Sequence, residues 1–321
     1  ASRIVQRTVQ PENDSDTPQK AQTLLEVLDW HFHKHPQRIH IEFYQENTRG
    51  ETIRFEQLHN TASCIAAGLQ SHGLEPGDRV ALMLPSEADY FYCFMGILMA
   101  GGIPVPIYPP VRINQLEDHL QRQKAILKNA EVKFLITVKQ AKIISRWLRA
   151  QLDCLQQVFM AAELKSSPQA FYKPNIQAQQ TAFLQYTSGS TGDPKGVVLT
   201  HANLLANIRA MGHEVQAKST DIFISWLPLY HDMGLIGAWL GIMYYAAKLT
   251  IMSPLRFLKK PENWLWAIHQ HQGTLSAAPN FAFELCCKRI RDEDIVGLDL
   301  SSWRLAFNGA EPVNPASMQA F

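Results

Sequence analysis

Several features are scarce in this chain of 321 residues, and each scarcity excludes a class of protein. The net charge is only +1, so the chain lacks the basic excess of a nucleic-acid-binding protein. The five cysteines form no CxxC pair, and we expect a reduced, cytoplasmic protein with buried thiols. The longest apolar run, residues 90–108, contains Gly101, Gly102, Pro104 and Pro106, which excludes one continuous membrane helix.

The apolar content of 46% is typical of a folded protein, and the length predicts two domains or lobes at roughly 150 residues each. Strand-like and helix-like segments alternate along most of the chain. Strands are predicted at 39–43, 52–55, 79–84, 103–107, 133–138, 183–185, 197–199, 222–226, 249–252, 275–277 and 304–307. Helices are predicted at 24–35, 56–71, 86–100, 115–129, 140–151, 235–246, 261–271 and 281–290, with another starting at 315. This alternation predicts an α/β fold of parallel sheets covered by helices.

The two ends of the chain lie outside this pattern. Residues 1–20 are polar, with prolines and acidic side chains close together, and predict a flexible leader. Residues 315–321 look like the first turns of a helix at the very end of the chain. A domain seldom ends by starting a helix, so we expect a truncated chain.

A ten-residue loop between two apolar strands, TSGSTGDPKG at 187–196, has the chemistry of a phosphate site. Its glycines let backbone N–H groups approach an anion, its hydroxyls add donors, and Lys195 adds a charge-assisted bond. The pattern is not a Walker A loop. The alternative is a plain hairpin turn, although two to five residues would suffice for that. The candidate phosphate ligands are Thr187, Ser188, Gly189, Ser190, Thr191, Gly192 and Lys195.

Residues 186–196 resemble the phosphate-binding loop of the adenylate-forming superfamily, which contains acyl-CoA synthetases, luciferases and adenylation domains. The resemblance extends from about residue 23 to the last residue, with the motifs in the family's order. It implies that a carboxylic acid and ATP form an acyl-adenylate and pyrophosphate. It also implies two flavodoxin-like, doubly wound α/β lobes, one at about 71–190 and the other formed by about 21–70 and 191–321.

A second block, WLPLYHDMGLIG at 226–237, ends a predicted strand and begins a helix, with Asp232 as a plausible N-cap. His231 at this junction could be a packed core histidine. The family resemblance instead places it beside the substrate carboxylate, where an imidazole N–H would orient an oxygen for attack on the α-phosphate. We expect Gly234 and Gly237 to leave room for a chain to pass beside the helix start.

A third block, NGAEP at 308–312, follows a predicted strand. Small-residue loops after strands are where open α/β sheets bind ligands, although an ordinary β–α turn would look the same. In the family the matching loop holds adenine, which assigns adenine binding to Gly309, Ala310, Glu311 and Pro312.

Three strings resemble the fatty acyl-AMP ligases within the superfamily: YHDMGLIG at 230–237, APNFAFELC at 278–286 and PVPIYPP at 104–110. These ligases pass the acyl group to the phosphopantetheine of an acyl carrier protein rather than to CoA. Met233, Gly234 and Phe281 are the expected acyl-binding residues. Phe283, Trp239, Leu240 and Met243 could also line an apolar tunnel, although such residues are more often plain core.

Several family elements are absent from this sequence, including the magnesium-binding glutamate and the C-terminal domain with its catalytic lysine. We therefore expect no metal site in the chain, a main Mg²⁺ ligand outside it, and a break before the family's β-barrel subdomain. Losing several preorganised groups predicts very weak activity for this piece alone. Two alternatives to a fatty acyl-AMP ligase remain: an acyl-CoA synthetase or other adenylating ligase, and a non-catalytic half-domain that binds nucleotide or a partner.

Overall fold

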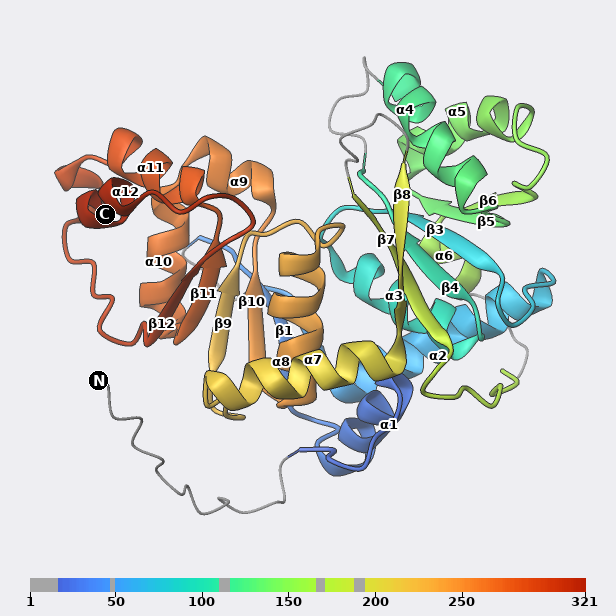
Figure 1. Ribbon diagram of the computed structural model, residues 1–321, viewed down its shortest axis with the longest axis horizontal. Coiled ribbons are helices and arrows are strands. Elements are labelled where there is room, and N and C mark those ends of the chain that lie inside the picture. Colours follow the sequence, from blue (N-terminus) through green and yellow to red (C-terminus); the bar gives the residue numbers. More distant parts are fainter. Residues whose placement is uncertain (1–16, 47–49, 110–115, 166–170, 188–193) are drawn as a thin grey trace, which may run out of the picture.

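A computed structural model describes residues 17–46, 50–109, 116–165, 171–187 and 194–321. Its strands form two main sheets that lie side by side (Figure 1). This confirms the predicted α/β class. Residues 17–20, assigned to the leader from sequence, include a turn, and Arg209 donates to the carbonyl of Gln19 at 3.0 Å.

The larger sheet combines segments from both ends of the chain. Its six strands run in the order β12-β11-β9-β10-β1-β2, and every neighbouring pair is parallel except β1 with β2. In chain order the strands are β1 (Ile39–Phe43), β2 (Thr52–Arg54), β9 (Ile222–Ser225), β10 (Lys248–Ile251), β11 (Leu275–Ala278) and β12 (Leu305–Asn308). Two chain segments that are 168 positions apart, from Arg54 at the end of β2 to Ile222 at the start of β9, therefore share one sheet.

The smaller sheet is wholly parallel and runs in the order β4-β3-β5-β6. Its strands are β3 (Arg79–Met83), β4 (Ile103–Pro106), β5 (Phe134–Thr137) and β6 (Gln157–Phe159). Counted within this lobe, the order is that of the start of a flavodoxin-like sheet. Val80 and Leu82 join the core shared with the larger sheet, whereas Ala81 and Met83 face a second apolar cluster. Both faces of the sheet are thus covered, as parallel sheets require.

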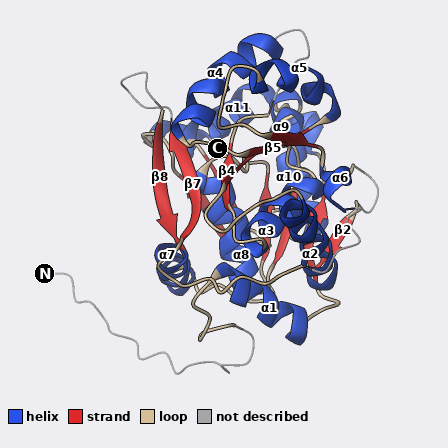
Figure 2. Cartoon of the chain, turned by 90° about the vertical axis from the view of Figure 1, so that its right-hand side faces the viewer, coloured by secondary structure: helices blue, strands red, loops and turns tan. Residues whose placement is uncertain are grey.

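The strands that flank the glycine loop differ from the parallel pattern predicted for them. β7 (Thr181–Thr187) and β8 (Lys195–Thr200) pair antiparallel as a separate ribbon, seen at one side of the molecule in Figure 2. The reason is the short connection between them. Parallel neighbours need a crossover of a dozen or more residues, and this loop is shorter.

The helices agree with prediction where the apolar spacing is strong. The structure also has one strand, β6, and three helices, α6, α7 and α9, that were not predicted from the sequence. The helices are α1 (Leu24–Lys34), α2 (Phe55–Ser71), α3 (Ala88–Met99), α4 (Leu116–Asn129), α5 (Lys139–Arg149), α6 (Ala161–Lys165), α7 (His201–Glu214), α8 (Gly241–Tyr244), α9 (Pro254–Lys259), α10 (Glu262–His271), α11 (Asn280–Arg289) and α12 (Pro315–Ala320). A π-helix, η2 (Met233–Leu240), and a 3₁₀ turn, η3 (Asp292–Ile295), complete the set. Among the described residues, no helix is both long and apolar enough to cross a bilayer.

Aromatic packing joins the two lobes at α3 and η2. The Trp239 ring lies edge-on against Phe91 and Phe94, with ring centroids 4.7 and 5.2 Å apart. Its indole N–H donates to Nε2 of His40 on β1 at 3.1 Å. A buried aromatic pair contributes about 0.5–1.5 kcal/mol beyond its burial. The lobes therefore share one continuous apolar core.

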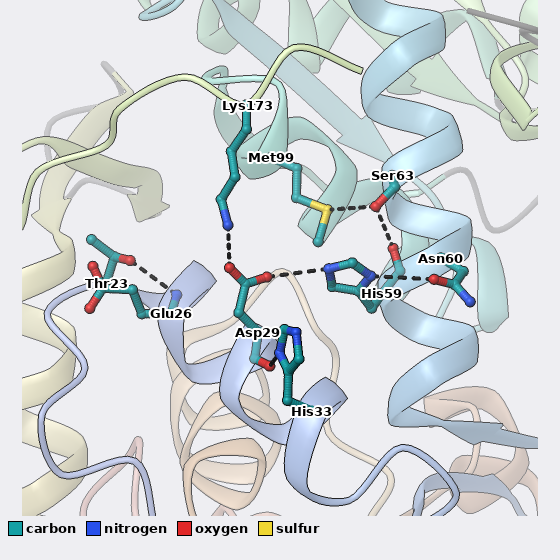
Figure 3. A network of polar contacts seen from close by, with 9 residues as sticks. All are labelled: Thr23, Glu26, Asp29, His33, His59, Asn60, Ser63, Met99 and Lys173. Atoms are coloured by element: carbon teal, nitrogen blue, oxygen red, sulfur yellow. Dashed lines mark hydrogen bonds and ion pairs between the residues drawn. The ribbon is translucent and has the colours of Figure 1, made fainter. Parts of the chain in front are cut away.

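Asp29 on α1 connects three segments of the chain (Figure 3). One carboxylate oxygen lies 3.2 Å from Nε2 of His59 on α2, and the other pairs with Lys173 in the segment before β7. Burial alone would raise the pKa of Asp29, but the hydrogen bonds from His59 and Lys173 outweigh it and lower that pKa. Ser63 donates to the His59 carbonyl at 2.9 Å and steadies α2 at the same point.

The expectation of buried thiols is only partly correct. Cys93 and Cys286 are buried, and burial raises the pKa of both thiols, to about 12 for Cys286. Cys64 and Cys287 are exposed, because each lies on the solvent side of a helix whose other face packs on the core. All five cysteines are free.

Three buried histidines make the fold sensitive to acid. Burial lowers the pKa of His31 to about 3, and of His40 and His201 to about 4. His40 uses both ring nitrogens, Nε2 for Trp239 and Nδ1 for the Ala247 carbonyl at 3.3 Å. Each ring is therefore held in its neutral form.

We predict that the free energy of unfolding falls as the pH drops from about 6.5 toward 4. The unfolded chain takes up these three protons near pH 6.5 and the folded chain does not, so each histidine removes about 1.4 kcal/mol per pH unit. Urea titrations at pH 7.5, 6.0 and 5.0 measure this slope. In the wild-type chain the Leu24 N–H donates to Nδ1 of His201 at 3.2 Å, and His201→Asn keeps an acceptor for it. This variant should lower the slope by the contribution of one histidine, about 1.4 kcal/mol per pH unit. An unchanged slope in that variant would contradict the assignment.

Candidate active site

A cavity of about 680 Å³ lies where the carboxyl ends of the parallel strands of both sheets meet. Open α/β sheets bind ligands at this edge, because the strands end there and their loops turn away to leave a crevice. The lining residues are 84–86 after β3, 108–109 after β4, Val138 after β5, 185–187 in β7, 226–228 and 230–234 after β9, 253–255 and Leu258 after β10, Pro279 and Phe281 after β11, and Ala310 after β12.

This cavity brings together residues from all three sequence motifs. Thr187, His231 and Ala310, one from each block, lie in its wall. The expected acyl-binding residues Met233, Gly234 and Phe281 line it too. The segment 188–193, which carries Ser188, Gly189, Ser190, Thr191 and Gly192, lies outside the described residues.

Lys195 begins β8 directly opposite Thr187 in the antiparallel ladder. Its side chain is exposed, and it lies beside the cavity wall rather than in it. This register places the positive charge of Lys195 at the end of the β7–β8 ribbon that joins the glycine loop. Such a charge suits a phosphate at the rim of the cavity.

His231 lies at the end of the loop that follows β9, where it is exposed and borders the cavity. Burial lowers the pKa of its ring, and the neighbouring Asp232 offsets part of that shift. At pH 7 the imidazole is therefore neutral, with one N–H to donate. Asp232 caps η2 through its Oδ1, which accepts from the Met233 N–H at 2.7 Å.

The helix after His231 is not the regular α-helix predicted for 235–246. Residues 233–240 form the π-helix η2, and the Gly241 N–H bonds to the carbonyl of Ile236, five residues back. The π-helix is a rare element that is frequently found at functional sites. The role expected for Gly234 also changes, since a Cβ there would lie 2.3 Å from the Pro228 carbonyl oxygen. Gly234 permits this backbone contact, whereas Gly237 faces open space.

The 309–312 loop is tied to the cavity wall at Phe281. Oε1 of Glu311 accepts from the Phe281 N–H at 2.6 Å, at the N-terminus of α11, where a carboxylate is favoured. Ala310 has a left-handed φ of 67°, which turns the loop over the cavity. A Cβ on Gly309 would lie 3.8 Å from the Met233 sulfur. The adenine role of Gly309, Ala310, Glu311 and Pro312 stays a prediction.

The tunnel residues predicted from helical spacing were partly wrong. Phe283, Trp239, Leu240 and Met243 are buried in the core and do not line the cavity. Sequence reasoning missed other wall residues, among them Tyr108, Trp226, Leu255 and Leu258. Leu255 and Leu258 are 54% and 42% exposed, and Ser253-Pro254 just before them was the available helix-start signal.

The family model described as "AMP-binding enzyme" matches residues 28–321, and the chain therefore belongs to that family. It is 44% identical over 337 residues to a medium-chain-fatty-acid–acyl-carrier-protein ligase, TtuA, of Teredinibacter turnerae. That match covers 93% of this chain and 52% of the relative. A second ligase of this name, JamA of Moorena producens, is 33% identical over 93% of this chain and 51% of its own length.

A solved structure agrees with these relatives. The fatty acyl-adenylate ligase from L. pneumophila, in complex with acyl adenylate and pyrophosphate, has a TM-score of 0.83 and 36% identity. The match covers 94% of this chain and 52% of that one. The chain thus spans about half the length of the relatives it matches.

We predict that Gly234→Ala disturbs the site while Gly237→Ala does not. The added methyl at 234 must displace the Pro228 carbonyl, which costs about 1–3 kcal/mol of stability and moves the loop carrying His231. At 237 the methyl meets nothing within 4 Å, and alanine favours the helix slightly. Thermal melting of the two variants checks this. Equal melting temperatures would contradict the contact.

Proposed function

We propose that the protein containing this chain activates a fatty acid with ATP and passes the acyl group to an acyl carrier protein. The main support is that residues of all three sequence motifs line one cavity. It has Thr187 in its lining, with Lys195 opposite Thr187 in the β7–β8 ladder, and the same lining includes His231 and the apolar Phe281. The names of the ligase relatives support the substrate class and the acceptor.

The chemistry follows from this arrangement. A carboxylate oxygen of the acid attacks the α-phosphorus of ATP, the bond between the α-phosphorus and the bridging oxygen breaks, and pyrophosphate leaves with that oxygen. The neutral His231 donates its N–H to the other carboxylate oxygen and orients the attack. Lys195 and the Thr187 hydroxyl stabilise charge on the phosphates.

The apolar wall favours a fatty acid over an amino acid. Of the described residues that line the cavity, Asp232 alone carries a carboxylate, and it caps η2. No acidic partner therefore remains there to receive an ammonium group. Leu255, Leu258 and Phe281 instead offer a hydrocarbon surface.

ATP enters this proposal as its magnesium complex. Among the described residues, no group of three His, Cys, Asp or Glu side chains could hold a metal ion. The metal would arrive on the phosphates, and these residues supply positioning rather than coordination. We place the activity in the cytoplasm, where the five free thiols stay reduced.

The test is formation of acyl-AMP by the complete protein from ATP, Mg²⁺ and a series of fatty acids, followed by mass spectrometry. A holo acyl carrier protein and CoA are offered together as acceptors. Acyl-AMP followed by acylated carrier protein supports the proposal. Acyl-CoA as the main product would instead indicate an acyl-CoA synthetase, and no fatty-acid-dependent AMP would contradict the adenylating function.

We predict that Lys195→Ala slows adenylation by about 10²–10³-fold, because a preorganised charge at the phosphates is lost. The exposed side chain predicts an unchanged melting curve. Lys218→Ala, an exposed lysine in the turn before β9, is the matched control for a lost surface charge. If Lys195→Ala melts like wild type and adenylates at the wild-type rate, Lys195 has no role in the site.

A further inference from the structure

The loop that carries His231 has no regular structure, so its backbone needs partners from elsewhere. Each carbonyl from Pro228 to His231 accepts one hydrogen bond. Pro228 accepts from the His231 N–H at 3.3 Å, and His231 accepts from the Leu235 N–H at 2.8 Å. The two carbonyls between them, of Leu229 and Tyr230, take their donors from side chains of distant segments.

Those donors are both buried, and they come from α3 and β7, which lie outside the larger sheet that carries the loop. The Tyr90 hydroxyl on α3 donates to the Leu229 carbonyl at 2.6 Å, and Nε2 of Gln185 on β7 donates to the Tyr230 carbonyl at 2.7 Å. Tyr90 is 1% exposed and Gln185 is 5% exposed. The Tyr108 ring also packs edge-on against Tyr230, with centroids 4.8 Å apart.

For the stability of the fold alone, glutamine is an unfavourable residue at position 185. Its Oε1 is buried and has no hydrogen-bond partner within the described part of the chain. A buried, unpaired amide oxygen costs free energy, whereas a methionine of similar length would not. The residue also lies two positions before Thr187, so one short stretch of β7 touches both the phosphate loop and the His231 loop.

We propose that Tyr90 and Gln185 are positioning residues that hold the 229–231 backbone and thereby place the His231 ring against the carboxylate of the acid. The contact between His231 and the carboxylate rests on the proposed function. The positioning of His231 by Tyr90 and Gln185 rests on the hydrogen bonds alone. The two donors cross from α3 and β7 to the loop after β9, so His231 is placed correctly only when the two lobes are packed as seen here.

The variants are Tyr90→Phe, which removes one hydroxyl, and Gln185→Met, which removes the amide but keeps the length. Each has a matched control. Tyr92→Phe removes a hydroxyl from the same helix, where the ring lies under Lys165 instead of beside the loop. Gln70→Met removes an amide that donates to a backbone carbonyl, that of Tyr172, at the same 2.7 Å but on α2.

The first measurement is an NMR titration of the His231 ring, assigned by the signal that His231→Gln removes. In Tyr90→Phe and Gln185→Met we expect a shifted ring resonance and a midpoint closer to 6.5, since a looser loop moves the ring away from the cavity wall that desolvates it. The two controls should keep the wild-type titration. Unchanged His231 titrations in both test variants would overturn the proposal, whatever the activity.

The second measurement separates positioning from stability. In the complete protein, each test variant should raise KM for the acid roughly 5- to 10-fold, the size of one net hydrogen bond, with KM for ATP unchanged. Gln185→Met loses the bond to the Tyr230 carbonyl but also the unpaired Oε1, and because these two effects oppose each other its melting temperature should stay close to that of wild type. In a His231→Gln background neither variant should change KM further. A rise that persists there would show that the residues act without His231.

These measurements keep the two proposals apart. If no adenylation is found, the proposed function fails, and the ring titration still decides the role of Tyr90 and Gln185. If adenylation is found but the acid KM of both variants equals that of wild type, the positioning role fails and the proposed function stands.

Discussion

The backbone between Trp226 and Asp232 lies where the two sheets meet, and its polar groups constrain the rest of the site. A buried carbonyl without a donor costs about 1–3 kcal/mol, so each one needs a partner. Tyr90 and Gln185 supply two of them from the opposite lobe. The π-helix η2 follows directly, and its second residue, Gly234, has no room for a Cβ beside the Pro228 carbonyl. One short loop therefore couples lobe packing to the position of His231.

The same edge of the molecule collects the other parts of the site. Parallel strands point their carboxyl ends one way, and here two sheets do so toward one cavity. Glu311 links the loop after β12 to Phe281 at the start of α11. The loop proposed to hold adenine and the wall proposed to hold the acyl chain thus share a hydrogen bond, and neither can move far without the other.

Much of this could be predicted from sequence, and the missing parts have physical reasons. The strand and helix order, the family and the three motif blocks were readable because they depend on local spacing and residue type. Tyr90 looked like one more apolar core residue on α3, since only its hydroxyl differs from phenylalanine. Gln185 sits in an ordinary strand pattern. Their roles depend on contacts 139 and 45 residues away, which no local pattern shows.

Other differences also came from tertiary contacts. The apolar spacing of residues 235–246 suits an α-helix, but the structure has a π-helix over 233–240, which follows the Asp232 cap and the close approach of Gly234 to Pro228. Helical periodicity could not separate Phe281, which faces the cavity, from Phe283, which is buried beside Trp264. The antiparallel β7–β8 ribbon follows from loop length alone, and that could have been predicted.

The most direct test of the account is a crystal structure of the complete protein with a non-hydrolysable acyl-adenylate analogue. We expect the acyl chain against Met233 and Phe281, the adenine at residues 309–312, and the His231 ring within hydrogen-bond distance of the carbonyl that stands in for the acid. An analogue bound outside this cavity, or one whose carbonyl lies far from His231, would contradict it.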